Sequence, residues 1–463
     1  MRAWLPAGFL AWAVAAAAAE VAEVVADRAQ VSLDDGRSAI AEKGRWFGVG
    51  GRNGDSLPIS FFDGERLRQG SIRSRDTHVV ADADVDIAAE ALKVAKELRP
   101  SIDVRAYKAR LDALAQRLAV TGDTVREKAA SLAALLFERE GFAPGEPHTL
   151  DAVLDGRKGN CLGLSLLYLC VARKARVPVR LVTAPKHVFL QCGAGERRFF
   201  IETTRNGEFH DTPDYLRQHL GEQQMGEAGG IHLEALRAPQ TVGVLAEELG
   251  RVLRDAERYP EALRHYARAI EINPRHAEAY VGLGAVLIGL GKLDAGLEAC
   301  AKAAGLNRRD PEAYCYWGVA LRRLGRHADA CTQYAKAVEL RPRFDKAYCN
   351  WGVALERMAK HKEACDKQAK ALELNPRNAD AHFNWGVALA NLARFPQACA
   401  KFARADALKP RDAMTFFYWG IALVKVGKQA EGVGKLEAAA ALSPDLKAQV
   451  DEILAKLPPA PPE

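Results

Sequence analysis

The feature that most constrains the fold of this chain is a repeat of 34 residues in its second half. Glycines recur at this spacing, and four of the seven tryptophans each precede one of them. The repeating positions are Gly250, Gly284, Gly318, Gly352, Gly386 and Gly420, with Trp317, Trp351, Trp385 and Trp419. Proline and alanine keep the same period, which gives six units at 243–276, 277–310, 311–344, 345–378, 379–412 and 413–446. A fixed period of this length predicts a stack of similar supersecondary units.

The small residues and the proline predict the shape of one unit. Two antiparallel helices can cross closely where glycine or alanine stands, and proline cannot continue the second helix. The pattern resembles the tetratricopeptide repeat, whose units are helix pairs of this kind. The resemblance implies an all-α solenoid and makes the chain predominantly helical overall. Residues 447–463 then form a C-terminal helix and a proline-rich tail.

The resemblance also implies a concave face, which the fifth and ninth residues of each unit line. These residues are apolar in this chain. They are Val281, Cys315, Cys349, Phe383 and Phe417 at the fifth position, and Ala285, Val319, Val353, Val387 and Ile421 at the ninth. One interpretation is a groove for a protein or peptide partner. The other is that these side chains are packing residues of the solenoid, or are covered by the C-terminal segment.

The cysteines of the repeats follow the same register. Cys331, Cys365 and Cys399 share one unit position, and Cys315 and Cys349 share another. Equivalent positions in stacked helical repeats lie about 10 Å apart, beyond the reach of about 7 Å for a disulfide. We therefore predict that they are small apolar packing residues and bind no metal.

Residues 81–235 have a different character. Apolar periodicity predicts helices over 85–98, 101–119 and 124–140, the last with Thr121 or Asp123 as N-cap. A further helix ends near Lys174, and strands are predicted over 186–192 and 197–203. Residues 20–80 show no interpretable pattern, and the glycine-rich stretch 48–54 is assigned to a loop because no helix follows it.

Cys161 stands where that further helix begins, with Asn160 as its N-cap. The free N–H groups and the dipole of a helix N-terminus favour a thiolate, which is the reactive form of cysteine. His187 follows in Pro-Lys-His-Val-Phe, and Glu202 in Phe-Ile-Glu-Thr-Thr. These are the residue types of a thiol, a base and an acid that orients the base.

The turn between the two strands predicts their register. A two-residue loop at Ala194-Gly195 would place His187 directly opposite Glu202, and Phe189 opposite Phe200. His187 and Glu202 would then lie on one face of the hairpin, where the acid can hold the imidazole. A slip of one residue would put them on opposite faces.

The order of Cys161, His187 and Glu202 on a helix, a strand and the next strand resembles the transglutaminase-like branch of the papain-type cysteine fold. More specifically, Leu-Asp-Gly-Arg-Lys-Gly-Asn-Cys-Leu-Gly at 154–163 looks like bacterial SirB-type transglutaminase-like domains. Those domains are often joined to tetratricopeptide repeats. The resemblance implies an α+β domain in which Cys161 attacks an amide or ester carbonyl, His187 moves the proton and Glu202 orients His187. The acid of the family is often Asp, so that the longer Glu is a departure from it.

Three neighbouring residues are candidates for supporting this site. Asn160 caps the helix, Ser165 lies one turn after Cys161, and Asn206 is a candidate oxyanion donor beside the Cys161 backbone N–H. The function indicated is a cysteine-dependent acyl transferase or amide hydrolase with a repeat array for a partner or substrate. The alternative is a catalytically inactive scaffold for protein–protein interaction. No cofactor or metal is expected.

Composition limits the other classes of function. The surplus of 65 basic over 59 acidic residues is small and dispersed, which argues against a nucleic-acid partner. Residues 1–19 combine Arg2, an apolar run and a small-residue cleavage site before Glu20. They predict a cleaved signal peptide and a periplasmic or secreted protein, with no integral membrane segment after cleavage. The odd number of cysteines, nine, leaves a cytoplasmic location as the alternative.

Overall fold

The computed structural model divides the chain into two compact units, Met1–Val286 and Leu287–Glu463. It describes residues 20–457 apart from several gaps. The gaps are 25, 27, 34–37, 43–44, 50–54, 64–65, 74, 76, 84, 119–122, 147, 185–186, 194–196 and 212–234. The predicted signal peptide at 1–19 and the proline-rich tail after 457 therefore lie outside the described residues, as does most of the glycine-rich stretch. No described helix has the length and apolar character that crossing a bilayer requires.

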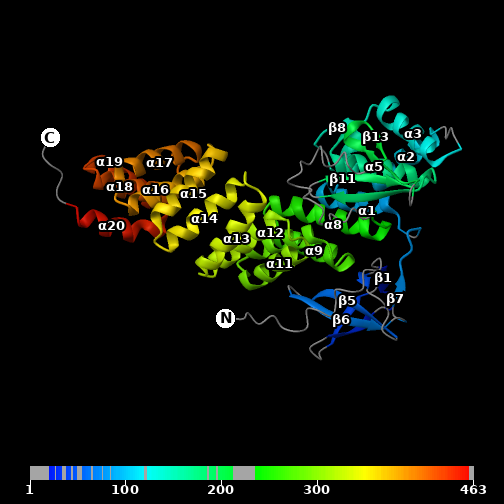
Figure 1. The fold of residues 1–463 in the computed structure, drawn as a ribbon, viewed down its shortest axis with the longest axis horizontal. Coiled ribbons are helices and arrows are strands. Elements are labelled where there is room, and N and C mark those ends of the chain that lie inside the picture. The colour runs from blue at the N-terminus through cyan, green and yellow to red at the C-terminus, as the bar shows by residue number, and fades with distance from the viewer. Residues whose placement is uncertain are drawn as a thin grey trace. The chain divides into compact units, whose positions relative to one another are not determined.

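The first unit begins with an antiparallel sheet of seven strands (Figure 1). The strands are β1 (Glu20–Val24), β2 (Arg28–Leu33), β3 (Ser38–Glu42), β4 (Trp46–Val49), β5 (Ser56–Asp63), β6 (Arg66–Arg73) and β7 (Thr77–Val79), in the order β3-β2-β6-β5-β4-β1-β7. Alternate residues such as Leu57, Ile59 and Phe61 are buried in its core, which is the period of a strand with one covered face. The sequence analysis found no pattern here, and Gly48, assigned to a loop, belongs to β4.

An α+β module follows in the same unit. Its helices are α1 (Ile87–Leu98), α2 (Val104–Gln116), α3 (Val125–Ala133) with the π-helical turn η3 (Ala134–Arg139), α4 (Leu150–Gly156) and α5 (Cys161–Lys174). The three helices predicted between 85 and 140 are thus present. Thr124, rather than Thr121 or Asp123, caps α3, because its side chain and that of Glu127 form a capping box.

Helix α5 is the centre of this module. From Leu162 to Ala172 every residue is buried, as expected for a helix covered on all sides. The sheet beside it consists of β10 (Val179–Ala184), β11 (His187–Cys192), β12 (Phe199–Glu202) and β13 (Glu208–His210), all antiparallel. A 3-10 turn, η5 (Thr203–Arg205), joins the last two strands. Short strands β8 (Ala143–Pro144) and β9 (Lys158–Gly159) pair in parallel just before α5.

Antiparallel helix pairs follow with the predicted period. They are α8 (Ala238–Asp255) with α9 (Tyr259–Ile272), α12 (Pro311–Arg323) with α13 (His327–Leu340), α14 (Asp345–Arg357) with α15 (His361–Leu374), α16 (Ala379–Asn391) with α17 (Phe395–Leu408), and α18 (Ala413–Lys425) with α19 (Gln429–Leu442). Between the first two pairs, the chain forms α10 (Ala277–Gly289), in which the boundary between the two units falls, and α11 (Leu293–Leu306). Another turn, η6 (Pro444–Leu446), and α20 (Lys447–Ala455) pack on α19 through Leu446 and Val450.

Helix α8 packs in the core of the α+β module with its first half and against α9 with its second half. Ala238, Val242 and Leu245 in its first half lie in the core of the α+β module. Gly250 in its second half faces the ring of Tyr266 on α9. The hydrophobic core therefore continues across residues 235–243, where the sequence analysis separated the two modules.

The sheet of the first unit is held to α9 by a buried carboxylate. Glu271 is 5% exposed and accepts a hydrogen bond from the backbone N–H of Phe62 at 2.9 Å. Its two oxygens also pair with the guanidinium of Arg45, whose Nε lies 3.2 Å from Oε2. Arg45 further donates to the carbonyl oxygen of Phe62 at 3.3 Å. A charge buried in this way is stable only because all these partners are present.

The repeating glycines let paired helices touch. A Cβ atom on Gly420 of α18 would lie 2.7 Å from Leu436 Cγ and 2.9 Å from the carbonyl oxygen of Gly432, both on α19. A backbone oxygen cannot move away by a change of rotamer, as a side-chain atom can. The close crossing predicted from the small residues is thus a direct backbone contact in this helix pair.

We expect Gly420→Ala to destabilise the α18–α19 pair by about 1–3 kcal/mol, the usual effect of overpacking. Gly434→Ala on α19 is the matched control, since no atom lies within 4 Å of its Cβ position. There the loss of glycine flexibility should stabilise the helix by about 0.5–1 kcal/mol. Hydrogen exchange of the α18 and α19 amides measures both effects. Equal protection in the two variants would contradict the backbone contact.

Candidate active site

Cys161 is the first residue of α5. The Oδ1 atom of Asn160, the N-cap, accepts the N–H of Gly163 at 2.9 Å. The Cys161 side chain is partly exposed, whereas the rest of the first turn is buried. Cys161 is therefore not fully buried and lies at the positive end of the helix dipole.

His187 is the first residue of β11 and lies between an acid and the thiol. Its Nε2 atom lies 2.6 Å from Oε2 of Glu202, and the side chain of Cys161 is near enough to the imidazole to contribute to its raised pKa. Because Glu202 occupies Nε2, the ring nitrogen left for the thiol is Nδ1. The ring stacks on Phe189, with centroids 6.1 Å apart and planes inclined by 19°. The structure thus brings the three residues named from the sequence together at one site.

Glu202 is the last residue of β12 and is 3% exposed. Its Oε1 atom accepts hydrogen bonds from the backbone N–H of Thr204 at 3.0 Å and from the Thr204 hydroxyl at 2.6 Å. Its Oε2 atom faces His187. Both carboxylate oxygens therefore have partners, as a buried charge requires.

The electrostatics of the site favour a charged pair. Burial alone would lower the pKa of His187, but its hydrogen bonds to Cys161 and Glu202 and the charge of Glu202 outweigh burial and raise this pKa to about 9. Burial likewise would raise the pKa of Glu202. The His187 and Thr204 hydrogen bonds and the charge of His187 prevail and lower it. At neutral pH the site therefore holds an imidazolium beside a carboxylate.

The predicted hairpin register was wrong by two residues. Strands β11 and β12 pair Leu190 with Ile201, and Gln191 with Phe200. In that register Glu202 lies opposite Phe189, so that His187 is its diagonal neighbour rather than its direct partner. A shift of two residues keeps every side chain on its face, whereas a shift of one would not. Phe189 and Phe200 are also diagonal, and their rings still meet edge to face at 5.7 Å.

The two other residues proposed to support the site are Ser165 and Asn206. Ser165 is fully buried, and its hydroxyl lies 3.0 Å from that of Thr203, which ties α5 to the end of β12. Asn206 is exposed and follows η5 in the left-handed conformation, with φ of 55°. Thr204 was missed by the sequence analysis. The signal for it was its hydroxyl two residues after the acid, a spacing at which Ser and Thr commonly bond local groups.

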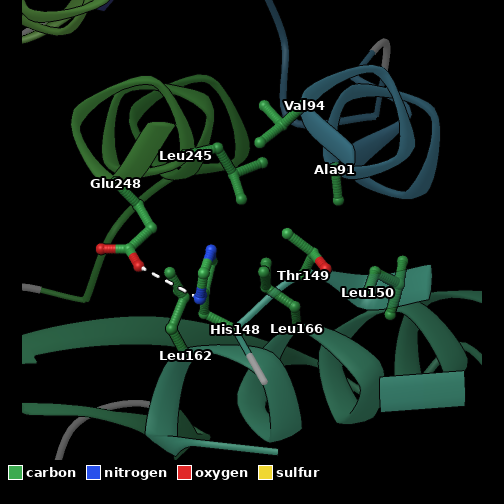
Figure 2. A pocket seen from close by; sticks show the side chains of 9 residues that line it. All are labelled: Ala91, Val94, His148, Thr149, Leu150, Leu162, Leu166, Leu245 and Glu248. Carbon is green, nitrogen blue, oxygen red and sulfur yellow. Dashed lines mark ion pairs between the residues drawn. The ribbon is translucent and has the colours of Figure 1, made fainter. Parts of the chain in front are cut away.

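Helix α5 also borders a small cavity (Figure 2). Leu162 and Leu166 line it together with residues of α1 and α8, and His148 points into it beside Glu248. The Nδ1 atom of His148 lies 3.8 Å from Glu248 Oε1. The free volume of about 10 Å³ is enough for one water molecule and too small for an organic ligand.

The apolar residues proposed to line the concave face are largely packed. Val281, Cys315, Cys349 and Phe417 are 5–8% exposed, and Phe383 packs against the core of its unit. The ninth-position residues Ala285, Val319, Val353, Val387 and Ile421 are partly exposed. The fifth position thus belongs largely to the solenoid wall, and the ninth position, with Phe383, offers partly exposed apolar surface.

Three of the four repeating tryptophans are covered by lysines of the same helix pair. Lys367 lies 3.8 Å from the ring centroid of Trp351, Lys401 lies 3.4 Å from that of Trp385, and Lys435 lies 4.0 Å from that of Trp419. These cation–π contacts recur with the period of the repeat. They explain the tryptophans of these three units by packing within each unit.

Comparison with known families agrees with both modules. Residues 105–242 match the model of the transglutaminase-like superfamily. Residues 250–291 match a TPR repeat model, and residues 311–344 match a tetratricopeptide repeat model. No curated protein matched the chain.

Among solved structures, the similar chains include tetratricopeptide repeat proteins. YrrB, described as a TPR protein with an unusual peptide-binding site, is 23% identical, covers 42% of this chain and 98% of its own, and has a TM-score of 0.35. A thermophilic TPR protein of Thermus thermophilus, TTC0263, is 21% identical over 39% of this chain and 99% of its own, with a TM-score of 0.36. PilF of Pseudomonas aeruginosa is 20% identical, covers 46% of this chain and 97% of its own, and has a TM-score of 0.40.

The transglutaminase-like match spans Cys161, His187 and Glu202, and the tetratricopeptide match at 311–344 coincides with one predicted unit of 34 residues. The chain therefore carries a transglutaminase-like domain followed by tetratricopeptide repeats.

Proposed function

We propose that the transglutaminase-like domain is a cysteine-dependent acyl transferase or amide hydrolase. The observation that carries this proposal is the hydrogen bond of His187 to the buried Glu202, with the side chain of Cys161 near the same imidazole. A nucleophile, a base and a group that orients the base are the three parts of a covalent acyl-transfer site.

The proposed reaction has two steps. The Cys161 thiolate attacks the carbonyl carbon of an amide or ester and forms an S–C bond. The tetrahedral intermediate then expels the amine or alcohol, which takes a proton from the His187 imidazolium. Water or a second amine gives a proton to His187, attacks the thioester and breaks the S–C bond. Throughout, Glu202 holds the ring and stabilises its positive charge.

The first turn of α5 supplies one group for the developing oxyanion. The backbone N–H of Cys161 is among the first four of the helix, which have no partner within the helix. It lies at the positive end of the helix dipole, where a negatively charged oxygen is stabilised.

The repeat array is proposed to bind a protein or peptide partner. Support comes from the repeat family and from the partly exposed ninth-position side chains.

An acylation experiment tests the catalytic proposal. The full chain is treated with p-nitrophenyl acetate, and the adducts are located by mass spectrometry. We expect an acetyl thioester on Cys161 that decays in water and faster with added amine, and no such adduct in Cys161→Ser. The His187→Ala variant should acylate at least about 100-fold more slowly, the lower range for loss of a general base. A folded wild-type chain that forms no adduct on Cys161 would leave the inactive scaffold as its function.

A further inference from the structure

Thr204 donates both of the hydrogen bonds that Oε1 of Glu202, the carboxylate oxygen not bonded to His187, accepts. The hydroxyl lies 2.6 Å from Oε1 and the backbone nitrogen 3.0 Å. The hydroxyl is thus the closer of the two donors. Thr204 itself is partly exposed.

Glu202 needs such an anchor because of its length and its place in the chain. A glutamate side chain has three rotatable bonds, and β12 ends at this residue. The carboxylate folds back to cap the turn η5, which begins at the next residue. With Oε1 held by Thr204, the remaining oxygen, Oε2, is directed to His187.

We propose that Thr204 is a positioning residue of the active site: its hydroxyl fixes the Glu202 carboxylate so that Oε2 holds the imidazole of His187 in line with Cys161. This inference rests on the proposed acyl-transfer function for its consequence in catalysis. The geometric part, from Thr204 through Glu202 to His187, can be measured without any substrate.

The sign of the effect separates positioning from a simple charge effect. If the hydroxyl only stabilised the negative charge, its removal would make Glu202 more basic and strengthen its hold on the imidazolium. If the hydroxyl fixes the side chain, its removal lets the carboxylate rotate away, and His187 loses its partner. Positioning therefore predicts weaker proton binding by His187, and the charge effect predicts equal or stronger binding.

The first experiment titrates His187 in the full chain labelled with ¹³C-histidine, with the signal assigned by its loss in His187→Ala. We expect Thr204→Val to weaken proton binding at His187 about tenfold, one pKa unit. Thr204→Ser, which keeps the hydroxyl, should restore the wild-type titration. Thr241→Val is the matched control, because Thr241 is a buried threonine whose hydroxyl bonds the carbonyl of Arg237. It should leave the titration unchanged.

A double-mutant cycle tests whether Thr204 acts through Glu202. In the Glu202→Gln background, Thr204→Val should change the His187 titration by less than about twofold, since the carboxylate to be positioned is gone. A full tenfold change in that background would overturn the proposal. So would unchanged or stronger proton binding in Thr204→Val alone.

The two proposals fail in different ways. If Cys161 forms no acyl adduct but Thr204→Val still weakens proton binding at His187, the proposed function fails and the positioning role stands. If acylation occurs and is equally fast in wild type, Thr204→Val and Thr204→Ser, the positioning role fails and the function stands.

Discussion

Iodoacetamide is expected to modify Cys161 of the wild-type chain at pH 6 about 100-fold faster than it modifies Cys161 of the His187→Ala variant. An ordinary thiol, with a pKa of about 8.5, is almost wholly protonated at that pH and reacts slowly. In the wild type the proton can reside on His187 instead, because the imidazolium is stabilised by Cys161 and Glu202. The factor of about 100 is the lower range for the loss of a general base.

The pH range of this advantage follows from the two shifted pKa values. The pKa of His187 is raised to about 9, so that the imidazolium persists through neutral pH and is lost above about pH 9. The pKa of Glu202 is lowered, so that the carboxylate that holds the ring persists into the acid range. The ratio of wild-type to variant rates should therefore be largest between about pH 5 and pH 7. It should approach one above pH 9, where ordinary thiols are ionised too.

The chain contains its own reference thiols for this measurement. Cys331 and Cys399 are partly exposed like Cys161, but burial raises their pKa values. Peptide mass spectrometry after partial alkylation gives the three rates from one sample. A Cys161 rate at pH 6 that matches these references and does not depend on His187 would contradict the thiolate–imidazolium pair.

Glu271→Ala is expected to loosen the N-terminal sheet by about 3 kcal/mol, the low end of the cost of breaking a buried ion pair. The substitution leaves the Phe62 N–H and the Arg45 guanidinium without their shared carboxylate. Hydrogen exchange of the β4 and β5 amides should rise about 100-fold, since each tenfold change corresponds to about 1.4 kcal/mol.

Glu261→Ala on the same helix is the control. Glu261 is more than a third exposed and pairs with Arg258, one turn away. Exposed pairs of this kind contribute at most about 1 kcal/mol. Exchange in β4 and β5 should therefore match the wild type. If Glu271→Ala behaved in the same way, the carboxylate would not be what holds the sheet to α9.

The sequence was informative about the site wherever a local rule applied. The position of Cys161 at a helix start followed from Asn160 and the apolar run behind it. That His187 and Glu202 lie on one face of the sheet followed from the alternation of side chains along a strand. The register itself depends on the loop between the strands. A two-residue loop was assumed, and the pairing found differs by two residues.

The N-terminal sheet shows where pattern reading failed. Its strands are short and separated by turns, so that each carries only two or three alternating apolar residues such as Leu57, Ile59 and Phe61. The surface that selects this fold also includes α9, whose Glu271 lies about 200 residues further along the chain than the strands it contacts. No window of sequence contains both partners.

The sequence by itself determined the repeat, its period, the helix pairs and the residue types of the site, because each depends on neighbours within one turn, one strand or one unit. Only the tertiary structure decided which apolar residues of the array are buried and that α8 is shared between two cores. It also decided that Thr204 anchors Glu202. These outcomes depend on how elements that are distant in the chain pack against one another. Such packing is determined by side-chain shape and hydrogen-bond geometry, which the periodicity of the sequence does not specify.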